Sequence, residues 1–274
     1  MPLLKQYLGF LNSTILWKDK TFFELESFDP ELKIDKLYDT IQLEIPNFIV
    51  LGKRIESFLA DYLEHSADYQ LLAKNIQIFS GTRTIGEIDF LLKDQRTNQN
   101  LHVEVVYKFY VYDPDRSQEQ AACWIGPNQK DSLLQKIDKL KNKQLPLLYT
   151  NEAVQLLKQS YDLDVQTFKQ KVCYFANLFI PLSIKADNLK DINKDCIEGF
   201  WIRKKDFTRK DFGNNVYKIP RKENWIVSPA SNTKWYSYDH VYDEMDEHLK
   251  TKRTPLIWSK KKDEQYQKFF VVWW

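Results

Sequence analysis

The segment Gly86–Tyr112, GEIDFLLKDQRTNQNLHVEVVYKFYVY, decides the fold that we expect for this chain. Two strands are predicted in it, over 86–93 and 101–112, because apolar, β-branched and aromatic residues are frequent in both parts. The stretch between them, DQRTNQN, holds turn-forming residues and has nothing apolar to bury. The segment therefore predicts two β-strands joined by a short polar loop.

Side chains alternate between two faces along a strand, so each predicted strand divides into two sets. The second strand has one face that is apolar throughout and should pack on the core: Leu101, Val103, Val105, Tyr107, Phe109 and Val111. Its other face carries His102, Glu104, Val106, Lys108, Tyr110 and Tyr112. The first strand has Glu87 and Asp89 on one face, and Ile88, Phe90 and Leu92 on the other.

The charged faces of the two strands give a candidate site. If the strands pair, Asp89 and Glu104 can lie near each other with Lys108 close by. Two carboxylates and a lysine on one sheet surface can form a site for a hard divalent cation. The alternative is that these charges are only the solvated face of an amphipathic strand, and periodicity alone favours that alternative.

The composition is that of a folded globular protein, with 43% hydrophobic and 28% charged residues in a chain of 274. The formal net charge is only +2, so a nucleic-acid partner would have to be held by local basic patches. Aromatic residues make up 15% of the chain. They can fill a core, and they can also supply surfaces on which bases stack.

The cysteines and the apolar segments bear on the compartment. Three widely separated cysteines form no CxxC pair, which argues against structural zinc and fits a reducing cytoplasm. The first twenty residues lack the basic region and the cleavage site of a signal peptide. No apolar run approaches the length that spans a bilayer. We therefore expect a cytoplasmic protein without a membrane partner.

Three regions are expected along the chain. Residues 1–45 form an N-terminal helical extension, 46–165 the core, and 166–274 a β-rich aromatic lobe that can be continuous with the core. Apolar spacing predicts a helix from Phe48 to Leu63, capped by Asn47. Further helices are predicted over 3–16, 131–140, 151–161 and 237–250, and further strands over 69–79, 171–182, 198–207, 216–221, 224–229, 255–262 and 268–274.

The order helix, strand, strand, strand in 46–112 resembles the core of the PD-(D/E)XK nuclease superfamily. Resolvase-like members have a helix with Gly and Glu four residues apart, a strand containing Asn, a GEID strand and a V-E-V-x-K strand. The matching residues are Gly52, Glu56, Asn75, Gly86, Glu87, Ile88, Asp89, Val103, Glu104 and Val105.

One position departs from that pattern. In the superfamily the lysine usually follows the second acid by two residues, and here that position is Val106. The nearest lysine is Lys108, four residues after Glu104. Because two and four are both even, Lys108 keeps the face of Glu104 but lies roughly 6 to 7 Å further along the strand.

The spacing of Glu104 and Lys108, with the segment that follows, also resembles the bacterial domain of unknown function family 1853. That resemblance covers residues 46–148 well and the aromatic C-terminal part less specifically. It implies a fold and a candidate site, and no substrate. The matching residues are Gly86, Glu87, Asp89, Glu104, Lys108, Phe109, Tyr110, Gly126, Pro127, Asn128, Asp131 and Lys136.

Together these resemblances imply an α/β, restriction-endonuclease-like fold with a mixed central sheet flanked by helices. The expected function is a metal-dependent nuclease that hydrolyses phosphodiester bonds of DNA or RNA. The alternative is an inactive nuclease fold that binds nucleic acid or a protein partner. The expected roles are catalysis for Asp89, Glu104 and Lys108; Mg²⁺ or Mn²⁺ binding for Asp89, Glu104 and Glu56; substrate binding for Lys136, Asn128 and Lys130; and further candidates in Glu87 and His102.

Overall fold

The computed structural model describes residues 2–18, 21–34, 43–46 and 48–274. Its centre is a nine-stranded mixed sheet in the order β3-β4-β5-β7-β8-β11-β10-β9, with β6 paired to β5. This confirms the predicted α/β class with a mixed sheet flanked by helices. The strands are β3 Tyr69–Ser80, β4 Arg83–Asp94, β5 Gln99–Tyr112, β6 Trp124–Ile125, β7 Phe168–Pro181, β8 Ile197–Arg203, β9 Val216–Lys218, β10 Leu256–Lys260 and β11 Tyr266–Val272.

Strand β5 is the long central strand of the sheet. It runs antiparallel to β4 and parallel to β7, with which it pairs from Asn100–Phe168 to Val111–Phe179. A separate two-stranded sheet near the N-terminus joins β1 Thr21–Phe22 to β2 Leu25–Glu26. The predicted strand pair is thus present, and the polar stretch between the strands forms the turn.

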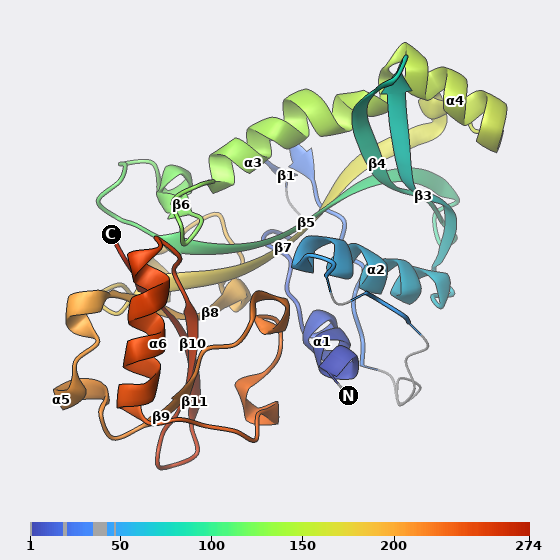
Figure 1. Cartoon of the computed structure of the whole chain (residues 1–274). Helices are drawn as coiled ribbons and strands as arrows, with labels where there is room; N and C mark the ends of the chain where they lie inside the picture. The colour runs from blue at the N-terminus through green and yellow to red at the C-terminus, as the bar shows by residue number, and fades with distance from the viewer. Residues whose placement is uncertain (1, 19–20, 35–42, 47) are drawn as a thin grey trace.

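Helices cover both faces of the sheet around β5. Helices α1 (Pro2–Leu11) and α2 (Leu51–Glu64) pack in one cluster with the predicted apolar face of β5. On the other face lies α3 (Leu133–Lys139), which continues through a π-helical turn and a 3₁₀ turn toward α4 (Asn151–Tyr161). Figure 1 shows α1 and α2 below β5, and α3 and α4 above it.

The second face of β5 is not solvated, so the amphipathic-strand interpretation is wrong. His102 and Glu104 are fully buried. Further along the same face, Val106 packs in one cluster with Leu133 and Ile137 of α3. The chain segment after β5 returns as a helix over this face, and that tertiary contact is invisible to the period-two pattern of the strand itself.

Several predicted boundaries need correction. Helix α2 begins at Leu51, so Phe48 precedes it and is 84% exposed; the predicted cap Asn47 lies outside the described residues. Helix α1 ends at Leu11 and does not reach residue 16. Residues 224–229 (NWIVSP) form turns and the ends of two 3₁₀ helices instead of a strand, and Trp225, Ile226 and Val227 are buried.

The C-terminal lobe extends the sheet and does not build a new one. Strand β8 pairs in parallel with β7, and β11 pairs in parallel with β8. Helices α5 (Arg209–Phe212) and α6 (Tyr238–Lys250) flank this part, and Ser237 caps α6. One cluster of buried side chains contains residues of α2 and β5 together with Trp201, Trp225 and Trp258. The sheet therefore crosses the predicted boundary at residues 165 and 166 without interruption.

Two further observations concern the helices and the cysteines. Among the helices of the part that the structure describes, none combines the length and apolar character needed to cross a membrane. Cys123, Cys173 and Cys196 are free and buried.

Candidate functional site

The site begins where β4 separates from β5. Backbone pairing between them runs from Asp94–Gln99 to Phe90–Val103 and ends there, while β4 stays paired with β3 to Arg83. The next residue of β4 is Asp89, and its Oδ2 accepts a hydrogen bond from Val105 N at 2.9 Å. A buried carboxylate thus replaces the backbone acceptor that the ladder no longer supplies. In Figure 1 the β3–β4 hairpin rises out of the plane of β5 and β7.

A bend in the β3–β4 hairpin accompanies this separation. Ile88 and Phe90, which were predicted on one face of the strand, keep a continuous register with β3 but pack in different clusters. Asn75 lies opposite position 89, between the pairs Ile76–Ile88 and Lys74–Phe90, and it has a φ of 53°. Asn tolerates this left-handed conformation better than most residues do. The bend turns the outer half of the hairpin toward α4 and leaves Asp89 at the fork.

Glu104 is held by a chain of side-chain hydrogen bonds. Its Oε1 lies 3.0 Å from His102 Nε2, and its Oε2 accepts from Gln144 Nε2 at 2.5 Å. His102 Nδ1 in turn lies 3.0 Å from Gln170 Nε2, which also donates to Leu145 O. Because the Gln170 amide nitrogen can only donate, His102 accepts at Nδ1 and donates from Nε2 to Glu104. The chain fixes the orientation of the carboxylate.

A second group of carboxylates lies beside this pair. Glu56 of α2 and Glu87 of β4 join Asp89, with one ligand atom of each within 4.8 Å of the others. Oxygen ligands around one Mg²⁺, at about 2.1 Å from the ion, are spaced about 3 to 4 Å apart, so the spacing of these three ligand atoms is close to what one such ion requires. The structure therefore brings Glu56 and Asp89 together as the resemblance implied. It adds Glu87 to them and leaves Glu104 next to the group.

A lysine already lies among these acids. Lys53, one turn before Glu56 on α2, donates to Glu56 Oε2 at 2.6 Å and to Glu87 Oε1 at 2.5 Å. Burial opposes its charge, but the hydrogen bonds to the two carboxylates prevail and raise the pKa of Lys53. The ammonium group balances negative charge in the region that a divalent cation would use.

Two of the three lysines predicted for the site, Lys108 and Lys136, lie in different surroundings. Lys108 pairs with Asp131 Oδ2 at 2.5 Å and lines a groove beside the acids. Lys136 of α3 lines the pocket that Glu56, Glu87 and Asp89 also line, which we call the acidic pocket. Its Nζ donates to Gln144 Oε1 at 2.6 Å. Through Gln144, Lys136 is linked to Glu104. Of these two lysines, the one linked to Glu104 thus comes from α3, the helix that covers the sheet. The catalytic role of Lys108 stays a prediction.

Burial and charge shift several of these groups. Desolvation, and then the charge of Glu104, raise the pKa of Asp89 to about 8. Burial also raises the pKa of Glu56. Desolvation, assisted by the positive charge of Lys139, lowers the pKa of Lys136 to about 8. Such opposed shifts in one pocket are frequent at catalytic and cation-binding sites.

The covering helix approaches β4 closely because of Gly86. A Cβ at position 86 would lie 2.6 Å from Leu147 Cδ2, so a larger residue would force the Leu147 side chain to shift. The 3₁₀ turn that holds Leu147 directly follows the turn that holds Gln144. The first residue of the GEID segment therefore permits the approach of the helix that supplies Gln144 and Lys136.

The remaining predicted substrate-binding residues lie in the loop before α3. Asn128 Oδ1 accepts from Thr254 N at 2.7 Å, and Thr254 Oγ1 donates to Pro127 O at 2.8 Å. The Asn128 side chain thus ties this loop to the C-terminal lobe. Lys130 is exposed at the edge of the groove that Lys108 lines.

Sequence reasoning missed Lys53, Gln144 and Gln170. Lys53 has a signal in the sequence, since lysine and glutamate three residues apart share a helix face. Gln170 lies opposite His102 in the parallel β5–β7 register, and Gln144 lies in a π-helical turn. These two depend on tertiary pairing and have no local signal.

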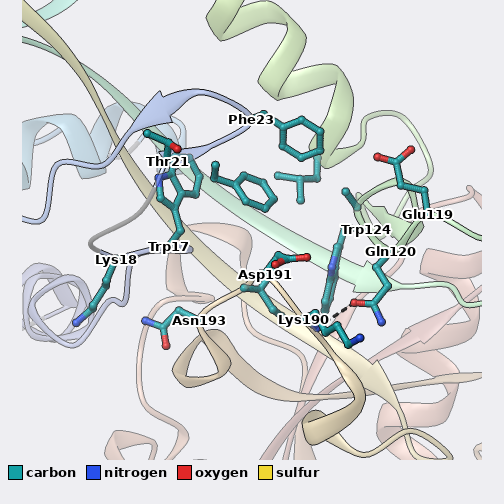
Figure 2. Close-up of a pocket in the computed structure, with 14 residues that line it drawn as sticks. Trp17, Lys18, Thr21, Phe23, Glu119, Gln120, Trp124, Lys190, Asp191 and Asn193 are labelled. Carbon is teal, nitrogen blue, oxygen red and sulfur yellow. Dashed lines mark hydrogen bonds between the residues drawn. The ribbon is translucent and has the colours of Figure 1, made fainter.

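A further cavity, of about 590 Å³, lies apart from these residues. Aromatic side chains, among them Trp17, Phe23 and Trp124, line it (Figure 2). The side chain of Gln120 in its wall accepts a hydrogen bond from Lys190 N at 2.9 Å. It shares no lining residue with the acidic pocket, so we do not assign it to the same chemistry.

Fold and site together define an α/β protein whose mixed sheet divides at a buried carboxylate, with a helix on each face supplying acids and lysines. The chain belongs to the family of the domain of unknown function DUF1853, whose family model matches residues 24–272. No curated protein and no solved structure matches the chain.

Proposed function

We propose that this protein has a PD-(D/E)XK-type nuclease core and hydrolyses phosphodiester bonds of nucleic acid with Mg²⁺ or Mn²⁺. The observation that carries the proposal is the buried pair Asp89 and Glu104 at the fork of β4 and β5, with Glu56 and Glu87 beside it. Burial of a carboxylate costs free energy, because the ionised group loses its hydration. Three acids, Glu56, Glu87 and Asp89, and four lysines line one pocket beside Glu104, and this convergence supports a role in chemistry.

The oxygen-rich donor set fits Mg²⁺ or Mn²⁺, which prefer carboxylates and retained waters. Asp89, Glu56 and Glu87 would hold the ion, with Glu104 adjacent. A bound divalent cation supplies a water of lowered pKa and neutralises negative charge at the phosphate.

The protein side chains have separate tasks in this proposal. Gln144 and His102 keep Glu104 oriented through its two oxygens. Lys136 presents an ammonium group whose pKa of about 8 permits proton exchange near neutral pH. Such a group can stabilise charge on a phosphate oxygen or orient an attacking water.

The test is cleavage of labelled single- and double-stranded DNA and RNA with Mg²⁺ or Mn²⁺. Asp89→Asn and Glu104→Gln should each lower the rate at least about 100-fold, as is typical for groups that act on the reacting atoms. Asp243→Asn and Glu244→Gln, on the exposed side of α6, make the same chemical changes and should leave the rate unaltered. Equal rates in all four variants would mean that the site is misassigned.

A second candidate function is nucleic-acid binding without cleavage. The position of Lys53 favours it, because an ammonium group between Glu56 and Glu87 already satisfies part of the acid cluster. In that case wild-type protein would bind nucleic acid in a salt-dependent way and show no hydrolysis with either metal.

A further inference from the structure

A groove of about 680 Å³ continues from the acidic pocket along the C-terminal half of β5. Val105 and Lys136 line both hollows, so the groove and the pocket are contiguous. Its walls come from the segment before α2, the loop before α3 and residues 222–225 of the C-terminal lobe.

The groove is basic in a protein that is nearly neutral overall. Four lysines line it, namely Lys108, Lys130, Lys136 and Lys222, against two acids, Asp131 and Glu223. Asp131 is already paired with Lys108. Desolvation and then the positive charge of Lys108 lower the pKa of Lys222, so the positive charges of these two lysines in the groove repel each other. A polyanion would relieve this repulsion.

An exposed aromatic ring stands at the entrance of the groove. Phe48 is 84% exposed and Val50 is 69% exposed, and both line the groove ahead of α2. The exposed phenyl ring beside lysine side chains offers a flat apolar surface to a partner that also carries negative charge. A nucleobase is such a partner, since stacking of bases on aromatic side chains is common in single-strand recognition.

We propose that this groove binds a single strand of nucleic acid, with its phosphates against Lys108, Lys130 and Lys222 and one base stacked on Phe48. The inference rests on the proposed function in that the strand then leads a phosphodiester toward Asp89. A duplex is not expected to bind equally, because its base faces are covered by neighbouring pairs and cannot reach the ring.

The test separates binding from cleavage by using full-length protein in EDTA. The probes are fluorescein-labelled oligothymidylate and oligouridylate of about 12 nucleotides, and a blunt duplex of similar length. Anisotropy is read between about 50 and 200 mM KCl. We expect both single strands to bind more tightly than the duplex, with a comparison of the two showing whether DNA or RNA is preferred.

Two variants report on the two parts of the groove. Phe48→Ala should weaken single-strand binding about tenfold and leave duplex binding nearly unchanged, whereas Phe48→Trp should retain it. The double variant Lys130→Gln with Lys222→Gln should weaken binding and lower the salt slope by about 1.4, since each contact contributes roughly 0.7 for single strands. The matched controls are Leu182→Ala, and Lys185→Gln with Lys210→Gln, all exposed elsewhere.

Each outcome has a defined meaning. Unchanged single-strand binding in the groove variants, equal losses in the controls, or absence of binding at about 100 mM salt would overturn the groove proposal. Cleavage by wild type that is indifferent to the groove variants would overturn it and leave the nuclease intact. Groove-dependent binding without cleavage in Mg²⁺ or Mn²⁺ would support the groove and reject the nuclease.

Discussion

Individual side chains determine the charge state of the acidic pocket. Lys53 acts as an internal cation for Glu56 and Glu87, and Val105 N holds one oxygen of Asp89. A divalent ion that enters must displace the ammonium group of Lys53. The Lys53 side chain is 46% exposed, so it can swing into solvent without unfolding α2.

Removal of Lys53 should therefore strengthen metal binding. We expect Lys53→Met to lower the Kd for Mn²⁺ by about 3- to 10-fold, because partly exposed charged hydrogen bonds no longer compete with the ion. Titration calorimetry measures this directly. Lys74→Met, which removes a similarly exposed lysine that pairs with Glu64, is the control. A higher Kd for Mn²⁺ in Lys53→Met would instead mean that this lysine organises the site.

Asp89 should make the metal-free protein less stable as pH rises. Its pKa is about 8 in the folded state and 3.8 without burial. Between these values the unfolded chain releases a proton that the folded chain keeps, so folded-state stability falls with rising pH. The free energy of unfolding should therefore fall between about pH 5 and pH 8, and Asp89→Asn should reduce this fall by on the order of 3 kcal/mol.

Urea unfolding in EDTA at about pH 5 and pH 8 measures the effect of Asp89 on stability. The stability difference between the two pH values should shrink in Asp89→Asn and persist in Asp243→Asn. An unaltered difference would show that Asp89 is already ionised in the folded protein at neutral pH.

At the scale of elements, the site depends on the contact between β4 and the 3₁₀ turn after α3. We expect Gly86→Ala to destabilise the fold by about 1 to 3 kcal/mol, because its Cβ would overlap Leu147 Cδ2. Urea unfolding of the single variants Gly86→Ala and Leu147→Ala, and of the double variant, forms a double-mutant cycle. The double variant should lose less than the sum of the two single losses. Additive losses would mean that the contact between Gly86 and Leu147 does not limit how closely the 3₁₀ turn approaches β4.

At the scale of the whole molecule, core and C-terminal lobe form one sheet and share one buried cluster. We therefore expect a single cooperative unfolding transition in which far-UV circular dichroism and tryptophan fluorescence coincide. Two separate transitions would instead support independent domains on either side of residue 165. The fragment 1–165 should not fold, because it lacks β7, the parallel neighbour of β5.

The sequence by itself determined the local elements and the identity of the acids. Alternating residues predicted β4 and β5, and apolar spacing predicted α4 and α6 with nearly correct bounds, because these patterns reflect the geometry of one element. The residues Glu56, Glu87, Asp89 and Glu104 were all selected from motif spacing. The resemblance to the domain of unknown function family 1853 was confirmed, over residues 24–272.

Only the tertiary structure decided what surrounds those acids. The burial of Glu104 comes from α3 folding back over β5, and its orientation comes from Gln144 and from Gln170 on a parallel neighbour strand. The presence of Lys136 in the acidic pocket and the pairing of Lys108 with Asp131 have the same origin. Contacts between elements that are distant in sequence do not alter the residue periodicity of either element. The partners of Glu104, Lys108 and Lys136 are therefore set only when the chain folds.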